Sequence, residues 1–144
     1  MQLHRNFSAP LLTTALMVLL VCRPASGEDF SELFARVDPS VVTIQTVSLQ
    51  PGKSGVRQNR GIGSGTIVDK NLILTAAHVV NSADQIVVKF VNGKRTPATV
   101  ISSVRAGDVA LIRVRAIPDS AKVAHVGNSD KVRIGSEALV IGAP

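Results

Sequence analysis

Short runs of β-branched and aliphatic residues, separated by glycine, proline and polar turn residues, recur from about residue 40 to the end of the chain. Runs of this length with such boundaries predict β-strands. We expect strands over residues 40–49, 63–68, 72–75, 85–91, 96–104, 109–114 and 137–141. About seven short strands, with no long helix and no internal repeat, are typical of a small all-β barrel or sandwich.

The segment before these strands has a helical period. Residues 28–37 place four apolar side chains on one helical face, and acidic residues stand in the first turn. The four apolar residues are Phe30, Leu33, Phe34 and Val37. This spacing predicts a short amphipathic helix that Pro39 ends. We assign residues 28–38 to this helix and residues 39–144 to the β-domain.

The connections between the strands carry turn chemistry. Residues 50–60 combine one proline, two glycines and three basic residues with almost no apolar content, which predicts an exposed, mobile loop. Asn92 and Gly93 form the strongest short hairpin signal in the chain. Residues 105–107 and 126–130 are further turns.

The amino terminus has the pattern of an export signal. A short basic region precedes residues 11–21, an uncharged apolar run that is shorter than the about 20 residues a membrane-spanning helix needs. Ala25 and Gly27 are the small residues of a cleavage site. We predict a secretory signal peptide over residues 1–27, and a periplasmic or secreted protein without stable membrane insertion after cleavage. The alternatives are an uncleaved signal anchor and a lipoprotein site at Cys22.

Composition limits the classes of function. The single cysteine leaves with the signal peptide, which excludes disulfides and cysteine-protease chemistry in the mature chain. The net charge of +6 raises the alternative of a nucleic-acid or anionic-surface binder. However, the basic residues are scattered and there is no Trp or Tyr for base stacking, so we expect no nucleic-acid partner. The histidines lack metal-ligand spacing, and we expect neither a metal nor another cofactor.

His78 and Asp108 are the candidate catalytic residues. Each stands where a strand meets a turn, beside a small residue, Ala77 or Gly107. In a hydrolytic triad the carboxylate fixes the tautomer of the imidazole, which then takes the proton of a serine hydroxyl. Taken alone, such a histidine is more often structural, and such an aspartate is more often a turn residue. Only a sheet or barrel can bring two residues so far apart in the chain together.

Four segments in order, GSGTIVD, LILTAAHVV, GDVALIRV and VGNSDKVRIGSEALVIGAP, resemble the first half of the trypsin-like protease domain of the HtrA/Deg family. The resemblance covers roughly residues 41–144. It implies the first, six-stranded β-barrel of a chymotrypsin-type double barrel and the activity of a serine endopeptidase on polypeptides, with a role in protein quality control as one option. It also implies that His78 is the general base and that Asp108 orients it.

The resemblance places the nucleophilic serine and the oxyanion hole in a second barrel, past Pro144. Residues 127–129, Gly-Asn-Ser, imitate the nucleophile loop of the family, but Asp130 stands where a glycine is needed. Ser64 is interpreted as a small residue in a packed strand. We therefore expect an N-terminal fragment that carries the His and Asp of the triad, lacks the Ser and is inactive alone.

Two alternatives remain open at this point. The first is a non-catalytic β-barrel that binds peptides or proteins, as a degenerate protease would. The second concerns assembly, because members of the resembled family often trimerise through segments near the amino terminus, and residues 28–37 are a candidate for such a contact.

Overall fold

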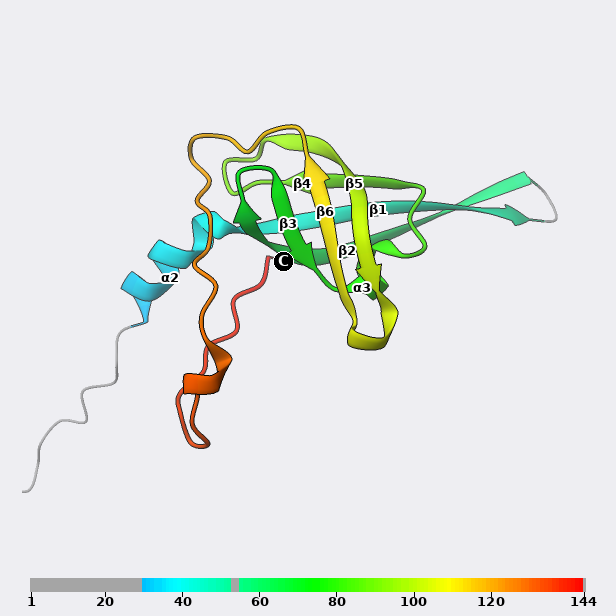
Figure 1. The fold of residues 1–144 in the computed structure, drawn as a ribbon. Helices are drawn as coiled ribbons and strands as arrows, with labels where there is room; N and C mark the ends of the chain where they lie inside the picture. Colours follow the sequence, from blue (N-terminus) through cyan, green and yellow to red (C-terminus); the bar gives the residue numbers. More distant parts are fainter. Residues whose placement is uncertain (1–29, 53–54, 144) are drawn as a thin grey trace, which may run out of the picture.

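A computed structural model describes residues 30–52 and 55–143, and its centre is a closed barrel of antiparallel strands in the order β1-β2-β3-β6-β5-β4 (Figure 1). The strands are β1 (Val41–Gly52), β2 (Gly55–Asp69), β3 (Leu72–Thr75), β4 (Gln85–Lys89), β5 (Arg95–Val104) and β6 (Val109–Val114). The predicted all-β barrel is confirmed, and six of the predicted strands are present. The predicted signal peptide, residues 1–27, lies outside the described residues.

The buried side chains of the strands fill the barrel, because buried and more exposed positions alternate along the strands that line it. Successive side chains of a strand point to opposite faces, so one face of each strand supplies the interior. The interior is mainly aliphatic, with one aromatic ring and the buried polar residues Ser40, Thr46 and Thr75. Its largest fully buried side chains are Val42, Ile44, Ile67, Ile73, Val80, Val88, Phe90, Ile112 and Val114.

Short helices connect and flank the strands. The amphipathic helix predicted before the barrel is present as α2 (Ser31–Val37), and the 3-10 turn η1 (Asp38–Ser40) follows it. The other helical elements are α3 (Ala77–Val80), η2 (Arg105–Gly107) and η3 (Ser129–Lys131). In the part of the chain that the structure describes, no helix is long and apolar enough to cross a membrane.

The prediction of an irregular loop over residues 50–60 is wrong. β1 and β2 remain paired from Val41 opposite Thr66 to Gly52 opposite Gly55, so a long hairpin extends beyond the barrel (Figure 1). Residues 50–52 and 55–60 are exposed, as predicted. Because both faces of this hairpin meet water, no apolar alternation marks its strands, and backbone pairing alone holds them.

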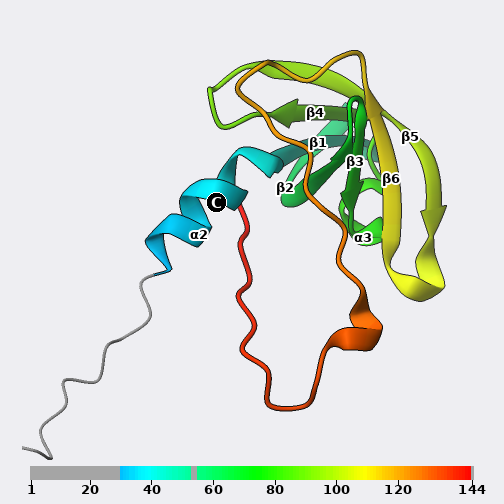
Figure 2. The same ribbon diagram turned by 60° about the vertical axis from the view of Figure 1, so that its left-hand side comes forward.

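The predicted strand over residues 137–141 is absent, and the strands end at Val114 although residues 39–144 were assigned to the β-domain. Apart from η3, residues 115–143 instead run as coil across the barrel and back toward α2 (Figure 2). Backbone bonds from Lys122 to Pro39 and from Ala124 to Ile67 hold the first part of this coil. A strand needs a neighbouring strand to bond its backbone groups, and none of the strands β1 to β6 in the described residues pairs with residues 137–141.

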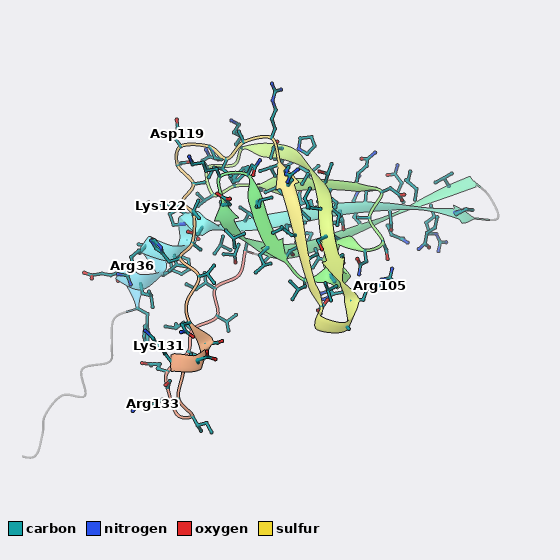
Figure 3. The ribbon with its side chains drawn as sticks, viewed as in Figure 1. Arg36, Arg105, Asp119, Lys122, Lys131 and Arg133 are labelled. Atoms are coloured by element: carbon teal, nitrogen blue, oxygen red, sulfur yellow. The ribbon has the colours of Figure 1, made fainter. Side chains whose placement is uncertain are left out.

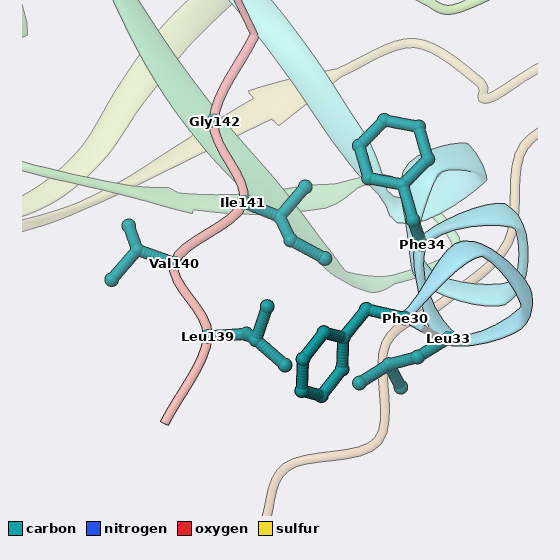
Figure 4. A pocket seen from close by; sticks show the side chains of 7 residues that line it. All are labelled: Phe30, Leu33, Phe34, Leu139, Val140, Ile141 and Gly142. Atoms are coloured by element: carbon teal, nitrogen blue, oxygen red, sulfur yellow. The ribbon is translucent and has the colours of Figure 1, made fainter. Parts of the chain in front are cut away.

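The apolar face of α2 meets the last described residues. A hollow of about 200 Å³ lies between them, lined by Phe30, Leu33, Phe34, Leu139, Val140, Ile141 and Gly142. Figure 4 shows the side chains of Leu139 and Ile141 directed toward this face, whereas Val140 points away from it. The coil at residues 139–142 therefore partly covers the helix, although Phe34 stays half exposed.

At Gly65 the backbone of β2 lies close against the packed interior. A methyl group there would lie 2.7 Å from Ile73 Cγ2 and 2.8 Å from Ile44 Cδ1, and both isoleucines are fully buried. We expect Gly65→Ala to lower the free energy of unfolding by about 1–3 kcal/mol through overpacking, measured as a lower urea midpoint. Gly127→Ala is the control, because Gly127 faces open space. An unchanged midpoint for Gly65→Ala would contradict this packing.

Candidate functional site

α3 is a single helical turn that carries His78 just after β3. Ala77 and Val80 are buried and anchor the turn in the core, whereas the side chain of His78 is 74% exposed. Gly63 of β2 lies against this turn, since a methyl group there would come within 2.7 Å of both methyl groups of Val79. The absence of a side chain at Gly63 therefore lets α3 approach the barrel closely.

Asp108 stands at the start of β6, directly after η2. Its backbone is left-handed, with φ 49° and ψ 42°, a conformation that is uncommon for a residue other than glycine. Its N–H donates to the carbonyl of Arg105 at 3.1 Å and closes the turn. Figure 3 labels Arg105 at this turn, close to α3. The left-handed turn presents the carboxylate of Asp108 to α3.

The structure brings His78 and Asp108 together. Nδ1 of His78 lies 2.7 Å from Oδ2 of Asp108, and the backbone N–H of His78 donates to Oδ1 at 2.9 Å. The pairing of β3 with β6 is the cause, since Thr75 lies opposite Ala110. The residues just after Thr75 and just before Ala110 therefore meet at one rim of the barrel. The contact is present, and the catalytic role of the pair stays a prediction.

The electrostatics of the contact fix the tautomer of the ring. The backbone N–H of His78, followed by its imidazole, holds the pKa of Asp108 below its ordinary value. An ionised carboxylate only accepts hydrogen bonds, so Nδ1 of His78 carries the hydrogen. In a neutral imidazole the other nitrogen, Nε2, is then an acceptor. The arrangement can take a proton at Nε2 while the carboxylate stabilises the resulting imidazolium.

The two serines that the sequence singles out serve other contacts. The hydroxyl of Ser64 donates to the carbonyl of Ala143 at 3.1 Å and accepts from its N–H at 3.0 Å, so it does more than fill space in a packed strand. Ser129 begins η3. Among residues 30–52 and 55–143, neither hydroxyl is hydrogen bonded to His78, and no three metal-ligating side chains form a group.

The surface beside His78 was not predictable from the sequence. A hollow of about 240 Å³ borders the imidazole, and the base of the long hairpin forms one of its walls, including Arg60. The interpretation of residues 50–60 as a loop does not place them next to His78. Buried and half-buried side chains alternate in β1 as far as Val47, whereas residues 55–62 are all exposed and carry no such pattern.

Comparison with known proteins gives a consistent family. Residues 63–144 match the model of the trypsin-like peptidase domain. A probable periplasmic serine endoprotease DegP-like of Pseudomonas fulva (strain 12-X) is 38% identical over 96 residues, which cover 65% of this chain and 20% of that protein. A protein of the same description from Hahella chejuensis (strain KCTC 2396) is 30% identical over 174 aligned positions, covering 100% of this chain and 37% of that protein.

A solved structure of an HtrA-type protease with decapeptide has the same fold. Its TM-score is 0.63 at 23% sequence identity, and the match covers 73% of this chain and 37% of that one. The chain thus spans 20% and 37% of the length of the two curated relatives described above.

The low pKa of Asp108 gives a testable pH dependence. Because this pKa is lower in the folded chain than in the unfolded chain, ionised Asp108 adds to stability above its ordinary pKa of 3.8. That contribution is lost as the pH falls through the lower, folded-state pKa. In a ¹³C NMR titration we expect the carboxyl carbon of Asp108 to titrate below 3.8.

His78→Ala separates the two causes of this shift. The backbone N–H remains and the imidazole is lost, so the pKa of Asp108 should rise only part of the way to its ordinary value. His125→Ala, which removes a histidine that makes no contact with Asp108, is the matched control and should leave the titration unchanged. A titration of Asp108 at its ordinary pKa in the unmodified chain would show that the contact does not form in solution.

Proposed function

This chain belongs to the trypsin-like peptidase family, and we propose that it supplies the histidine and the aspartate of the catalytic triad of a serine endopeptidase. The observation that carries the proposal is the 2.7 Å contact between Nδ1 of His78 and Oδ2 of Asp108 at the rim of the barrel. The names of the two periplasmic endoprotease relatives support the same activity. His78 is the proposed general base, and Asp108 is the residue that orients it.

The chemistry follows from the tautomer that Asp108 imposes. Nε2 of His78 takes the proton of a serine hydroxyl while the oxygen attacks the carbonyl carbon of a peptide bond. The imidazolium then gives that proton to the leaving amine, the C–N bond breaks, and the acyl group stays on the serine. A water molecule then gives a proton to Nε2 of His78 and attacks the acyl carbon. The imidazolium returns the proton to the serine oxygen, and the carboxylic acid is released. In each step the carboxylate of Asp108 stabilises the imidazolium and keeps the hydrogen on Nδ1.

The nucleophile and the oxyanion hole belong, in this proposal, to a second barrel that packs against this one. The contacts of Ser64 and the position of Ser129 in η3 support it, because neither serine is bonded to His78. Exposed apolar side chains after β6 also support it, since such surfaces are typical of interfaces. They are Val126, Val132, Ile134, Leu139 and Val140.

The proposal extends to the substrates, the location and the assembly of the enzyme. The substrates are polypeptides, and the solved neighbour, an HtrA-type protease with decapeptide, is consistent with such a substrate. The export pattern of residues 1–27 and the periplasmic relatives support a periplasmic or secreted enzyme. For a trimer, we propose a contact through α2, where Phe34 is half exposed.

The first test concerns a longer product of the same reading frame, which we expect to continue into a second barrel with a serine between glycines. That product should hydrolyse casein and react with a fluorophosphonate. His78→Ala should lower kcat by about 10⁶ and Asp108→Asn by about 10⁴, because the triad loses its base or its tautomer. His125→Ala is the control and should keep full activity. Full activity of the His78→Ala variant would exclude the proposed base.

The second test concerns the 144-residue chain by itself. Without a nucleophile it should neither cleave casein nor react with the fluorophosphonate, and Ser64→Ala and Ser129→Ala should not alter that result. Peptide binding without cleavage in the longer product would favour the alternative of a non-catalytic binding barrel. Cleavage by the short chain that depends on His78 would show instead that the nucleophile lies within it.

A further inference from the structure

A second hollow lies on the outer face of the barrel. The hollow that borders His78 lies on the other side of the hairpin. Three neighbouring strands, β2, β1 and β4, present their outward side chains to the second hollow in two rows. One row is Ile62, Gln45 and Val87, and the other is Arg60, Val47 and Gln85. Together with Arg95 of β5 they line a hollow of about 390 Å³.

The two hollows meet at the base of the long hairpin. Both are lined by Thr46, Arg60, Gly61 and Ile62. β2 pairs with β3 only from Gly65 onward, so no strand covers the edge of β2 at Gly61. We call the two adjacent hollows together the hairpin groove. It begins at His78, passes Gly61 and ends at Arg95.

The hairpin groove is cationic from its middle, at Arg60, to its far end, at Arg95. Arg60 and Arg95 line it, and Lys89 lies directly opposite Arg95 on the outward face of the β4–β5 pair. Like charges in such positions destabilise a sheet. Within the described part of the chain none of these three side chains has a hydrogen-bond or ion-pair partner. No carboxylate lines either hollow, and the nearby Asp84 accepts the N–H of Leu49 at 2.6 Å.

We propose that the hairpin groove docks an acidic segment of the polypeptide substrate, next to the peptide bond that His78 attacks. This inference rests on the proposed function and adds the class of substrate. Carboxylates of the substrate receive paired hydrogen bonds from Arg60 and Arg95 and offset the repulsion between Arg95 and Lys89. The amide groups of Gln45 and Gln85 offer further donors along the same floor.

A polypeptide is the occupant that the position of the groove favours. The groove begins at the imidazole proposed to act on peptide bonds, so a chain held at Arg60 and Arg95 continues directly to that site. Arg60 and Arg95 line a hollow together with the Gln and Val side chains of its floor, and a peptide chain can enter such a hollow, whereas a lipid surface cannot.

Fluorescence anisotropy on the 144-residue chain tests the proposal, since binding needs no nucleophile. The probes are a fluorescein-labelled decapeptide with four consecutive glutamates and the same peptide with four glutamines. We expect the acidic peptide to bind about tenfold more tightly, and added salt to weaken it. The double variant Arg60→Gln and Arg95→Gln should abolish the difference. The matched control, Arg36→Gln with Arg133→Gln, removes two charges elsewhere (Figure 3) and should retain it.

Equal binding of the two peptides, or an equal loss in the control variant, would overturn the proposal, provided that circular dichroism shows every variant folded. Binding of phosphatidylglycerol vesicles that requires Arg60 and Arg95, without preference for the acidic peptide, would overturn the choice of a polypeptide. Acidic-peptide binding with no cleavage by the longer product would refute the proposed function and leave the groove as a peptide site. Cleavage without acidic preference would refute the groove alone.

Discussion

The register of β3 against β6 is the constraint on which the candidate site depends. Thr75 lies opposite Ala110, and this places the turn after β3 beside the turn before β6. A slip of one residue would move Ala110 and Ile112 from the interior to the solvent, so burial of these side chains holds the register. The contact between His78 and Asp108 is therefore maintained by the hydrophobic core and not by its own strength.

The contact itself is open to water. The side chains of His78 and Asp108 are 74% and 52% exposed, and an ion pair in such a position adds little to stability. Exclusion of water would strengthen the same hydrogen bonds. A second barrel or a bound substrate that covers this rim would thus change the electrostatics of the pair without moving it. This is consistent with a site that becomes effective only when another part of the protein closes over it.

The sequence predicted those parts of the fold in which burial leaves a pattern. The strands that line the interior alternate regularly, and the turns between them carry Gly and Asn, so the barrel could be predicted without coordinates. The outer half of the hairpin could not, because both of its faces meet water. The apolar run at residues 137–141 predicted a strand wrongly, since a strand requires a partner and the local pattern contains none.

The candidate site, like the fold, was predictable only in part from the sequence. His78 and Asp108 were identified as residues, and their resemblance to a protease motif implied their roles. The bond from the backbone of His78 to Asp108 was not foreseen, because it depends on the left-handed turn at Asp108. That turn has a consequence for engineering. A left-handed backbone costs a residue with a Cβ up to about 1–2 kcal/mol, with Asn and Asp among the better tolerated, and glycine would relieve this strain. Selection of variants for thermal stability alone would therefore favour Gly at position 108. Such a variant would lack the carboxylate that contacts the imidazole of His78.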